Sequence, residues 1–295
     1  MKNDTANLIL LKTITKIEGA YSHATIRAYK ADFLKFIEFC ALRNENALPA
    51  SSVSITQFII KLVNDGLCSA SIRRAVAGIS AIHRLNRMID PTKDPDVNIE
   101  MRRMHRKLGR LSKQAYGISK TELDKMIKSQ NNSLYGLRNK ALLLTAFNTL
   151  CRRSELTQLL VKDLTIYENG EGAILLRRSK VDQEAKGHLL TLNKTTIQTI
   201  KKWLNMGKIK EGYLFRGIDK ANNINNKLSA GQINRIFKKV AESSKLDSKL
   251  VTNISGHSLR VGAARELAKE GNGFPVLMSK GRWTKIDTVM KYIQN

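Results

Sequence analysis

The sequence predicts a mainly α-helical protein of two domains, the second of which also holds a small β-hairpin. Apolar residues recur at three- and four-residue steps along most of the 295 residues, as they do in amphipathic helices. Residues 111–118 interrupt this pattern with small and polar side chains. We therefore expect a helical domain at 1–112, a linker at 113–118 and a second domain at 119–295.

Positive charge is spread over both domains. Lys and Arg number 51 and Asp and Glu 25, so the formal net charge is +26, of which +8 falls in residues 1–112 and +18 in 113–295. A folded chain with this balance favours a polyanionic partner. Nucleic acid is the first candidate and an anionic membrane surface the second.

Several other classes of protein find no support in the sequence. Apolar runs such as 141–144 are far too short to span a bilayer, and the N-terminus opens no signal peptide. Cys40, Cys68 and Cys151 are scattered without zinc spacing, and we expect each to be a small buried residue in a reducing cytosol. The sequence thus predicts a cytoplasmic, DNA-associated protein without a membrane span, metal or cofactor.

The first domain is expected to consist of short helices. Residues 1–21 have weak periodicity and form either a mobile arm or a short helix. A clear helical pattern starts at Ser22, a second helix covers about 54–64, and a third starts near Ser69, which is a good N-cap. A fourth covers about 96–110, after two Asp-Pro turns.

Two neighbouring helices of this domain carry repeated basic faces, and a later helix at 230–244 adds a third. A solvated face is the ordinary explanation for one such helix, but repetition favours contact with phosphates. Such contacts position a protein on DNA without reading its sequence. The candidate DNA-binding residues are Arg73, Arg74, Arg84, Arg87, Arg102, Arg103, Arg106, Lys107, Arg235, Lys238 and Lys239.

The second domain opens with a capping box, Ser119 to Glu122. Two short apolar runs, 172–178 and 188–192, enclose a polar stretch and predict a β-hairpin, with Lys180 at the tip of its first strand or in its turn. Helices are expected at about 119–130, 134–148, from 149, 194–206, 230–244, around 257–260, from 274 and from about 287.

The stretch Ser255–Ala264 contains two residues, His257 and Arg260, that are suited to binding a phosphate. His257 and Arg260 are three residues apart, which places them on one face if both are helical. Small residues flank them, and a cation beside an imidazole with little bulk around it could seat a phosphate oxygen. A helix start with a polar face is the alternative.

Arg152 and Glu155 share the same three-residue spacing. They could form a surface ion pair that contributes little. Alternatively, the carboxylate could hold a buried arginine so that its planar fork grips a phosphate.

Taken in order, these residues resemble the active site of the tyrosine recombinases, also called phage integrases, and the Cre-like members in particular. The stretches 255–264 and 281–293 carry the likeness in local sequence. The matching set is Arg152, Lys180, His257, Arg260, Trp283 and Tyr292. The resemblance implies an N-terminal, SAM-like core-binding domain and an α+β catalytic domain. It also implies a site-specific recombinase that cleaves and rejoins DNA through a 3′-phosphotyrosine intermediate, without metal or ATP.

The chemistry of these groups fits that expectation. Arg152 and Arg260 would neutralise the phosphate oxygens, and the indole N–H of Trp283 would add a donor. Tyr292 would be the nucleophile, with His257 assisting the loss of its proton.

Two further side chains complete the expected catalytic set. Lys180 would protonate the leaving 5′ oxygen. Glu155 would orient Arg152 or the surroundings of His257.

The sequence departs from the family in two places. Leu150-Cys151 precedes Arg152 where relatives usually have a glycine and then a hydrophobe, and three residues follow Tyr292 where many relatives continue into a helix that docks on a neighbouring protomer. We expect a monomer in solution, a dimer on inverted-repeat double-stranded DNA and a tetramer in the synapse. A type IB topoisomerase or telomere resolvase, and a non-catalytic DNA-binding module, are the alternatives.

Overall fold

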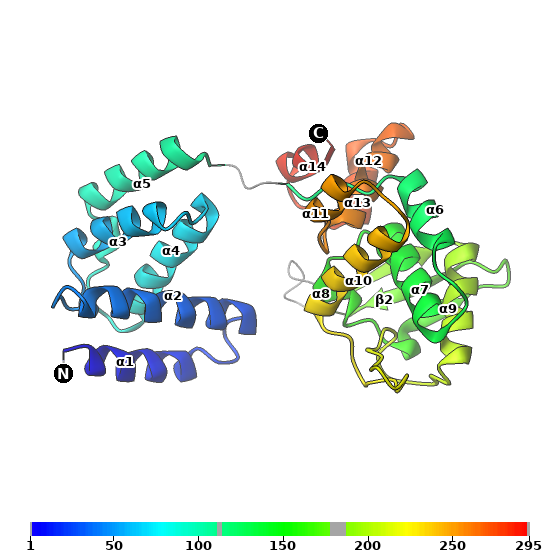
Figure 1. Ribbon diagram of the computed structural model, residues 1–295, viewed down its shortest axis with the longest axis horizontal. Helices are drawn as coiled ribbons and strands as arrows, with labels where there is room; N and C mark the ends of the chain where they lie inside the picture. Colours follow the sequence, from blue (N-terminus) through cyan, green and yellow to red (C-terminus); the bar gives the residue numbers. More distant parts are fainter. Residues whose placement is uncertain (1, 111–113, 178–186, 294–295) are drawn as a thin grey trace. The chain divides into compact units, whose positions relative to one another are not determined.

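The computed structural model describes residues 2–110, 114–177 and 187–293, and it divides into two compact units (Figure 1). The units are Met1–Lys113 and Gln114–Asn295. The expected boundaries at 112 and 119 fall on either side of this division. Each unit has a hydrophobic core of its own.

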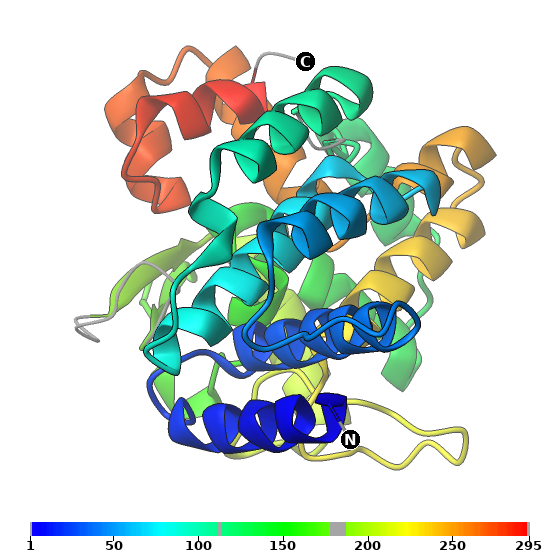
Figure 2. The ribbon, with the colours of Figure 1, turned by 90° about the vertical axis from the view of Figure 1, so that its left-hand side faces the viewer.

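The first unit is helical throughout its described elements (Figure 2). Its core is filled by aromatic and β-branched side chains, among them Phe33, Phe36 and Phe58, whose rings meet edge to face. Its helices are α1 (Lys2–Lys16), α2 (His23–Ala41), α3 (Ser52–Asn64), α4 (Ser69–Leu85) and α5 (Pro95–Leu108), with a 3-10 turn at Pro91–Lys93.

The N-terminal segment is the first point at which the structure selects between alternatives. α1 lies along α2, and its side chains Ala6, Leu10 and Ile14 are buried in the core (Figures 1 and 2). A mobile arm over 1–21 is therefore wrong for this helix. Leu8 and Leu11 are exposed, so apolar residues lie on more than one face of α1 and the helical pattern in the sequence is weak.

Helix starts in this unit follow capping chemistry, with two corrections. Ser51 accepts a hydrogen bond from the Ser54 amide at 3.1 Å, so α3 begins before the expected residue 54. Cys68, which is exposed, occupies the N-cap of α4. Ser69 is instead buried inside the helix, where its hydroxyl lies 3.1 Å from His105 Nδ1.

The second unit packs helices around a three-stranded antiparallel sheet of order β1-β2-β3 (Figure 1). Leu164 pairs with Ile174, which pairs with Leu190. The strands are β1 (Leu164–Ile166), β2 (Gly172–Leu176) and β3 (His188–Leu192). The helices are α6 (Lys120–Lys128), α7 (Leu134–Thr149), α8 (Arg153–Leu156), α9 (Lys194–Met206), α10 (Ala230–Ser243), α11 (Ser248–Asn253), α12 (Ser258–Lys269), α13 (Phe274–Gly281) and α14 (Ile286–Ile293).

The predicted hairpin of β2 and β3 is confirmed. The third strand of the sheet, β1, was not predicted. β1 has three residues and α11 has six, too few to show a period in the sequence. Lys180 lies outside the described residues. No helix in the described parts of the chain has the length and apolar character needed to cross a membrane.

The expected linker needs correction, because residues 114–118 belong to the second unit. The Tyr116 amide donates to the Asn253 carbonyl at 3.3 Å, and the Ile118 amide donates to the Ser258 carbonyl at 3.1 Å. The Ile118 side chain is fully buried. This segment has no helical period because it crosses α12 as an extended chain.

His83 is a buried polar group that joins two parts of the first unit. The Ala50 amide donates to its Nε2 at 3.0 Å, so Nδ1 carries the ring proton and donates to the Ile79 carbonyl at 2.8 Å. Burial lowers the pKa of His83 below its ordinary value of 6.5. The folded unit therefore holds a neutral imidazole.

This arrangement predicts a loss of stability in mild acid. Below pH 6.5 the unfolded chain binds a proton on His83 that the folded chain excludes, so stability falls until the pH reaches the lowered pKa of the folded state. His83→Asn removes this titration. Urea unfolding followed by circular dichroism between about pH 5 and 8 should show a shallower pH dependence for the variant. Parallel curves for the two proteins would contradict the neutral assignment.

Candidate active site

The turn between α7 and α8 places the first arginine. Leu150, the C-cap of α7, has a left-handed backbone with φ 50°, and Arg152 is the N-cap of α8. Arg152 Nη1 donates to Glu155 Oε1 at 2.7 Å, and the Arg152 amide donates to Glu155 Oε2 at 2.8 Å. Glu155 is buried, while the Arg152 side chain stays 20% exposed. Arg152 is therefore held by a buried carboxylate, and the alternative of a surface ion pair is wrong.

A second guanidinium reaches the same carboxylate from a distant part of the sequence. Arg282 Nη2 donates to Glu155 Oε2 at 2.9 Å. Burial acts to raise the pKa of Glu155, but the positive charge of Arg282 and the bonds from Arg152 outweigh it, and the pKa is lowered. Glu155 is thus a buried carboxylate that remains ionised.

Arg282 was not predicted as part of the catalytic set. It ends α13 in a left-handed conformation with φ 54°, and its side chain is buried. It donates to the carbonyls of Thr149 at 3.0 Å and Leu150 at 3.1 Å, besides Glu155. Its position directly before Trp283 was a signal in the sequence, but a lone basic residue does not reveal a buried partner 127 positions away.

Arg260 is the most enclosed cation of the group. It donates through Nη1 to the Leu150 carbonyl and through Nη2 to the Gly281 carbonyl at 2.5 Å. Burial, followed by repulsion from Arg152, lowers the pKa of Arg260 to about 10. It remains a cation at neutral pH.

The side chain of Arg260 lies over two aromatic rings, one from the turn between α13 and α14 and one from α14. Its guanidinium carbon is 4.7 Å from the Trp283 ring centroid and 5.7 Å from that of Tyr292. The two rings are 4.8 Å apart and tilted by 47°. The structure thereby brings together Arg260, Trp283 and Tyr292.

His257 lies just outside α12, as its N-cap, and not within the helix with Arg260. It is exposed, whereas Arg260 is buried. Desolvation of the imidazole lowers the pKa of His257, and the positive charges of Arg260, Arg153 and Arg152 lower it further. The imidazole is therefore neutral at neutral pH.

The model of the phage integrase family matches residues 117–295, and that of the phage integrase N-terminal SAM-like domain matches residues 13–88. The chain belongs to the phage integrase family. It is a site-specific tyrosine recombinase that acts on DNA.

Individual relatives and folds agree with this membership. The recombinase Cre of Escherichia phage P1 is 28% identical over 292 residues, covering 94% of this chain and 85% of Cre. The XerH site-specific recombinase bound to a palindromic difH substrate has a similar fold, with a TM-score of 0.67, 20% identity and coverage of 90% of this chain and 75% of that one. A lambda integrase dimer bound to a core site also has a similar fold, with a TM-score of 0.64 and 15% identity. The match covers 98% of this chain and 94% of that one.

Glycines near the candidate site of this recombinase allow neighbouring segments to pack closely. A Cβ on Gly262 would overlap the Ile118 carbonyl, and one on Gly281 would overlap the Trp283 ring. A Cβ on Gly256 would come within 2.8 Å of the Arg153 side chain. The seat for a phosphate oxygen at His257 and Arg260 stays a prediction.

The candidate DNA-binding residues fall into two groups in the recombinase. Some are engaged: Arg74 donates to the buried Asp32 at 2.7 and 2.9 Å, Arg103 pairs with Glu100 at 3.0 Å, and Lys238 donates to the Thr252 carbonyl at 3.3 Å. Arg73 is half-buried, and Arg84 lies 4.0 Å from Asp90. The exposed ones that form no ion pair with the described residues are Arg87, Arg102, Arg106, Lys107, Arg235 and Lys239. Arg87 also lies beyond the end of α4 and not on its face.

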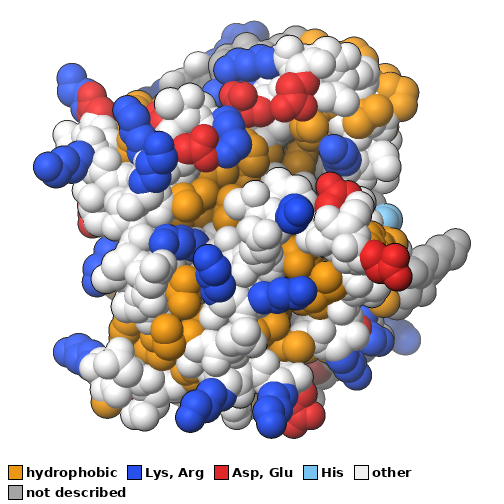
Figure 3. All heavy atoms as spheres, turned by 90° about the vertical axis from the view of Figure 1, so that its right-hand side faces the viewer, with side chains coloured by type: hydrophobic (Ala, Val, Ile, Leu, Met, Phe, Trp, Pro, Cys, Tyr) orange, Lys and Arg blue, Asp and Glu red, His pale blue; other side chains and the backbone are white. Residues whose placement is uncertain are grey.

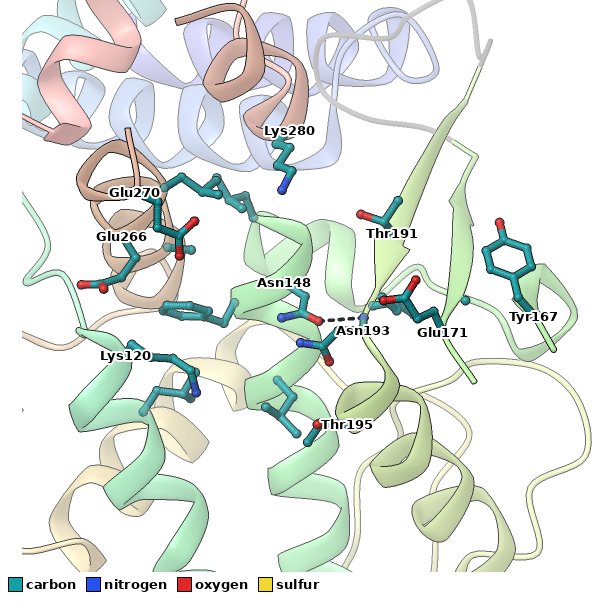
Figure 4. A pocket seen from close by; sticks show the side chains of 18 residues that line it. Lys120, Asn148, Tyr167, Glu171, Thr191, Asn193, Thr195, Glu266, Glu270 and Lys280 are labelled. Carbon is teal, nitrogen blue, oxygen red and sulfur yellow. Dashed lines mark hydrogen bonds between the residues drawn. The ribbon is translucent and has the colours of Figure 1, made fainter. Parts of the chain in front are cut away.

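A pocket of about 580 Å³ lies in the second unit, called the catalytic unit from here on, and basic side chains are spread over the face shown in Figure 3. Glu266 and Glu270 of α12 and Lys120 of α6 stand at its rim (Figure 4). Asn148 accepts a hydrogen bond there from the Asn193 amide at 3.2 Å. Of the predicted catalytic residues that the structure describes, none lines this pocket.

The close approach at Gly262 predicts a strong effect of a single methyl group. Gly262→Ala should displace the Ile118 backbone and destabilise the catalytic unit by roughly 1–3 kcal/mol or more. Gly231→Ala in α10 is the matched control, since its Cβ would have Ser229 Oγ at 4.0 Å as nearest neighbour. Denaturant unfolding followed by tryptophan fluorescence measures both, and equal stabilities would contradict the prediction.

Proposed function

We propose that Tyr292 attacks a DNA phosphodiester and forms a 3′-phosphotyrosine, releasing the 5′ oxygen. The observation that carries this proposal is the placement of Arg260 against both Trp283 and Tyr292. A guanidinium beside a phenol draws the scissile phosphate toward the nucleophile. The covalent bond preserves the energy of the phosphodiester, so the ends can be exchanged and resealed without ATP.

Arginine charge supports a reaction that needs no metal. The pentacoordinate transition state carries more negative charge than the phosphodiester, and Arg152 and Arg260 are the cations proposed to stabilise it. Both are held by fixed acceptors, a carboxylate for Arg152 and two carbonyls for Arg260. The indole N–H of Trp283 is proposed to bind a third oxygen position.

Proton movements are assigned to two groups. His257, neutral at neutral pH, is proposed to accept the phenol proton as Tyr292 attacks. Lys180 is proposed to donate a proton to the leaving 5′ oxygen, and it lies outside the described residues. Glu155 is proposed to act on Arg152, to which it is bonded, and not on His257.

The partner proposed for this chemistry is double-stranded DNA with inverted repeats. Exposed basic side chains such as Arg102, Arg106 and Lys239 would contact its backbone. The related XerH and lambda integrase were solved on DNA, the latter as a dimer on a core site. We propose two protomers on one repeat pair and four in the synapse, in a cytoplasmic, DNA-associated protein.

The nucleophile is tested by Tyr292→Phe. This variant should retain DNA binding, so duplexes that it selects from a random library define the recognition sequence. On a nicked duplex of that sequence, wild-type protein in excess EDTA should form a covalent adduct visible on denaturing gels, and Tyr292→Phe should form none. An adduct in the variant would refute the assignment of Tyr292 as the nucleophile.

Cleavage that needs added magnesium would refute the metal-free mechanism. Relaxation of plasmids that lack the sequence would favour a topoisomerase.

Assembly should depend on DNA, because the net charge of +26 opposes self-association until phosphates neutralise it. Analytical ultracentrifugation of the recombinase at moderate salt should give a monomer alone and two protomers on an inverted-repeat duplex. Two duplexes brought together should carry four. A stable tetramer without DNA would contradict this order of assembly.

A further inference from the structure

Arg282 is a buried arginine to which the proposed mechanism assigns no role. Four acceptors hold its guanidinium within 3.1 Å: the carbonyls of Thr149, Leu150 and Lys280 and the carboxylate of Glu155. Its side chain is 2% exposed. Arg282 therefore cannot reach DNA, and any contribution to the reaction must pass through the groups that it touches.

The contribution of Arg282 follows from the balance of charges around the Glu155 carboxylate. Arg152 donates one hydrogen bond to this carboxylate through Nη1, which orients its guanidinium, and a second through its backbone amide. If Arg152 were its only cation, the pair would be neutral, and a phosphate would meet little net positive charge. Arg282 supplies the second positive charge, so the group of three carries one net positive charge, on the arginine that remains 20% exposed.

We propose that Arg282 is a positioning residue that neutralises Glu155, so that the carboxylate orients Arg152 without cancelling the charge that Arg152 offers to the phosphodiester. The inference rests on the proposed function. The carbonyls of Thr149 and Leu150 hold the Arg282 guanidinium beside Glu155, because both precede Arg152 closely in the chain. Arg282 itself has a left-handed backbone, and Trp283 follows it directly.

The groups around Glu155 leave Arg282 as its main counter-charge besides Arg152. The titratable groups that interact with it are Arg152 and Cys151 before α8, Arg282 after α13, and Arg260 and His257 at α12. Burial raises the pKa of the Cys151 thiol to about 11, so it stays neutral. Arg260 is bonded to backbone carbonyls and not to the carboxylate.

Loss of Arg282 should leave a characteristic pH signature. In Arg282→Met, the buried carboxylate would cancel Arg152 at neutral pH, and the adduct should form about 10- to 100-fold more slowly at saturating DNA. DNA affinity should stay unchanged, because Arg282 is buried. As the pH falls, Glu155 takes up a proton, Arg152 regains its net charge, and the rate should rise relative to a variant without the carboxyl group.

The test compares four proteins on the nicked duplex selected by Tyr292→Phe: wild type, Arg282→Met, Glu155→Gln and the double variant. Glutamine keeps an acceptor for Arg152 without the charge. The double variant should therefore react within about threefold of Glu155→Gln and faster than Arg282→Met. Arg138→Met is the control, since Arg138 is also a buried arginine of this unit but donates to Asn139 and the Arg216 carbonyl.

The outcomes separate this inference from the proposed function. A wild-type rate for Arg282→Met, or a double variant far slower than Glu155→Gln, would overturn the role of Arg282 alone. A pH signature shared by Arg138→Met would do the same. Absence of any adduct with wild-type protein would instead overturn the proposed function. If Arg282→Met does not fold, the comparison of Glu155→Gln with the double variant decides, because neither keeps an unneutralised buried carboxylate.

Discussion

A buried carboxylate between two guanidiniums connects the parts of the catalytic unit. Glu155 joins the turn after α7 to the end of α13, through Arg152 on one side and Arg282 on the other. An ionised carboxylate away from water is costly unless it is paired and hydrogen-bonded. This one accepts bonds from two side chains and from a backbone amide. The cost of burial thus fixes the relative position of segments 127 residues apart.

Backbone conformation makes this connection possible. Leu150 and Arg282 both adopt left-handed conformations, which side chains with a Cβ disfavour. At Leu150 the buried side chain offsets that strain, since it packs in a small cluster with Ala263, Leu277 and Trp283. Its carbonyl then accepts from both Arg260 and Arg282. Leu150 thus lacks the conformational freedom that a glycine would have at this position. Its side chain adds packing next to the candidate active site instead.

Arginines near the candidate nucleophile differ in burial from the basic residues on the surface of the first unit. In the first, Arg74 and Arg103 are paired with acidic side chains, while Arg102 and Arg106 remain exposed. In the second, the arginines nearest the candidate nucleophile are buried and held by carbonyls. Exposed cations attract a polyanion over several ångströms, whereas enclosed ones act over short range with little screening by salt. Composition alone does not distinguish the two uses.

The sequence by itself determined the helical class, the β2–β3 hairpin and the family, because these depend on local periodicity and on motifs of a few residues. The capping box at Ser119 and the pairing of Arg152 with Glu155 were predictable for the same reason, since each spans three residues. Tertiary structure decided what depends on distant neighbours. It packed Ile118 against Gly262 where a linker was expected, placed His257 outside the helix of Arg260, and brought Arg282 to Glu155. Local patterns carry no information about which backbone atoms approach from elsewhere in the chain, and burial and counter-charge follow from that approach.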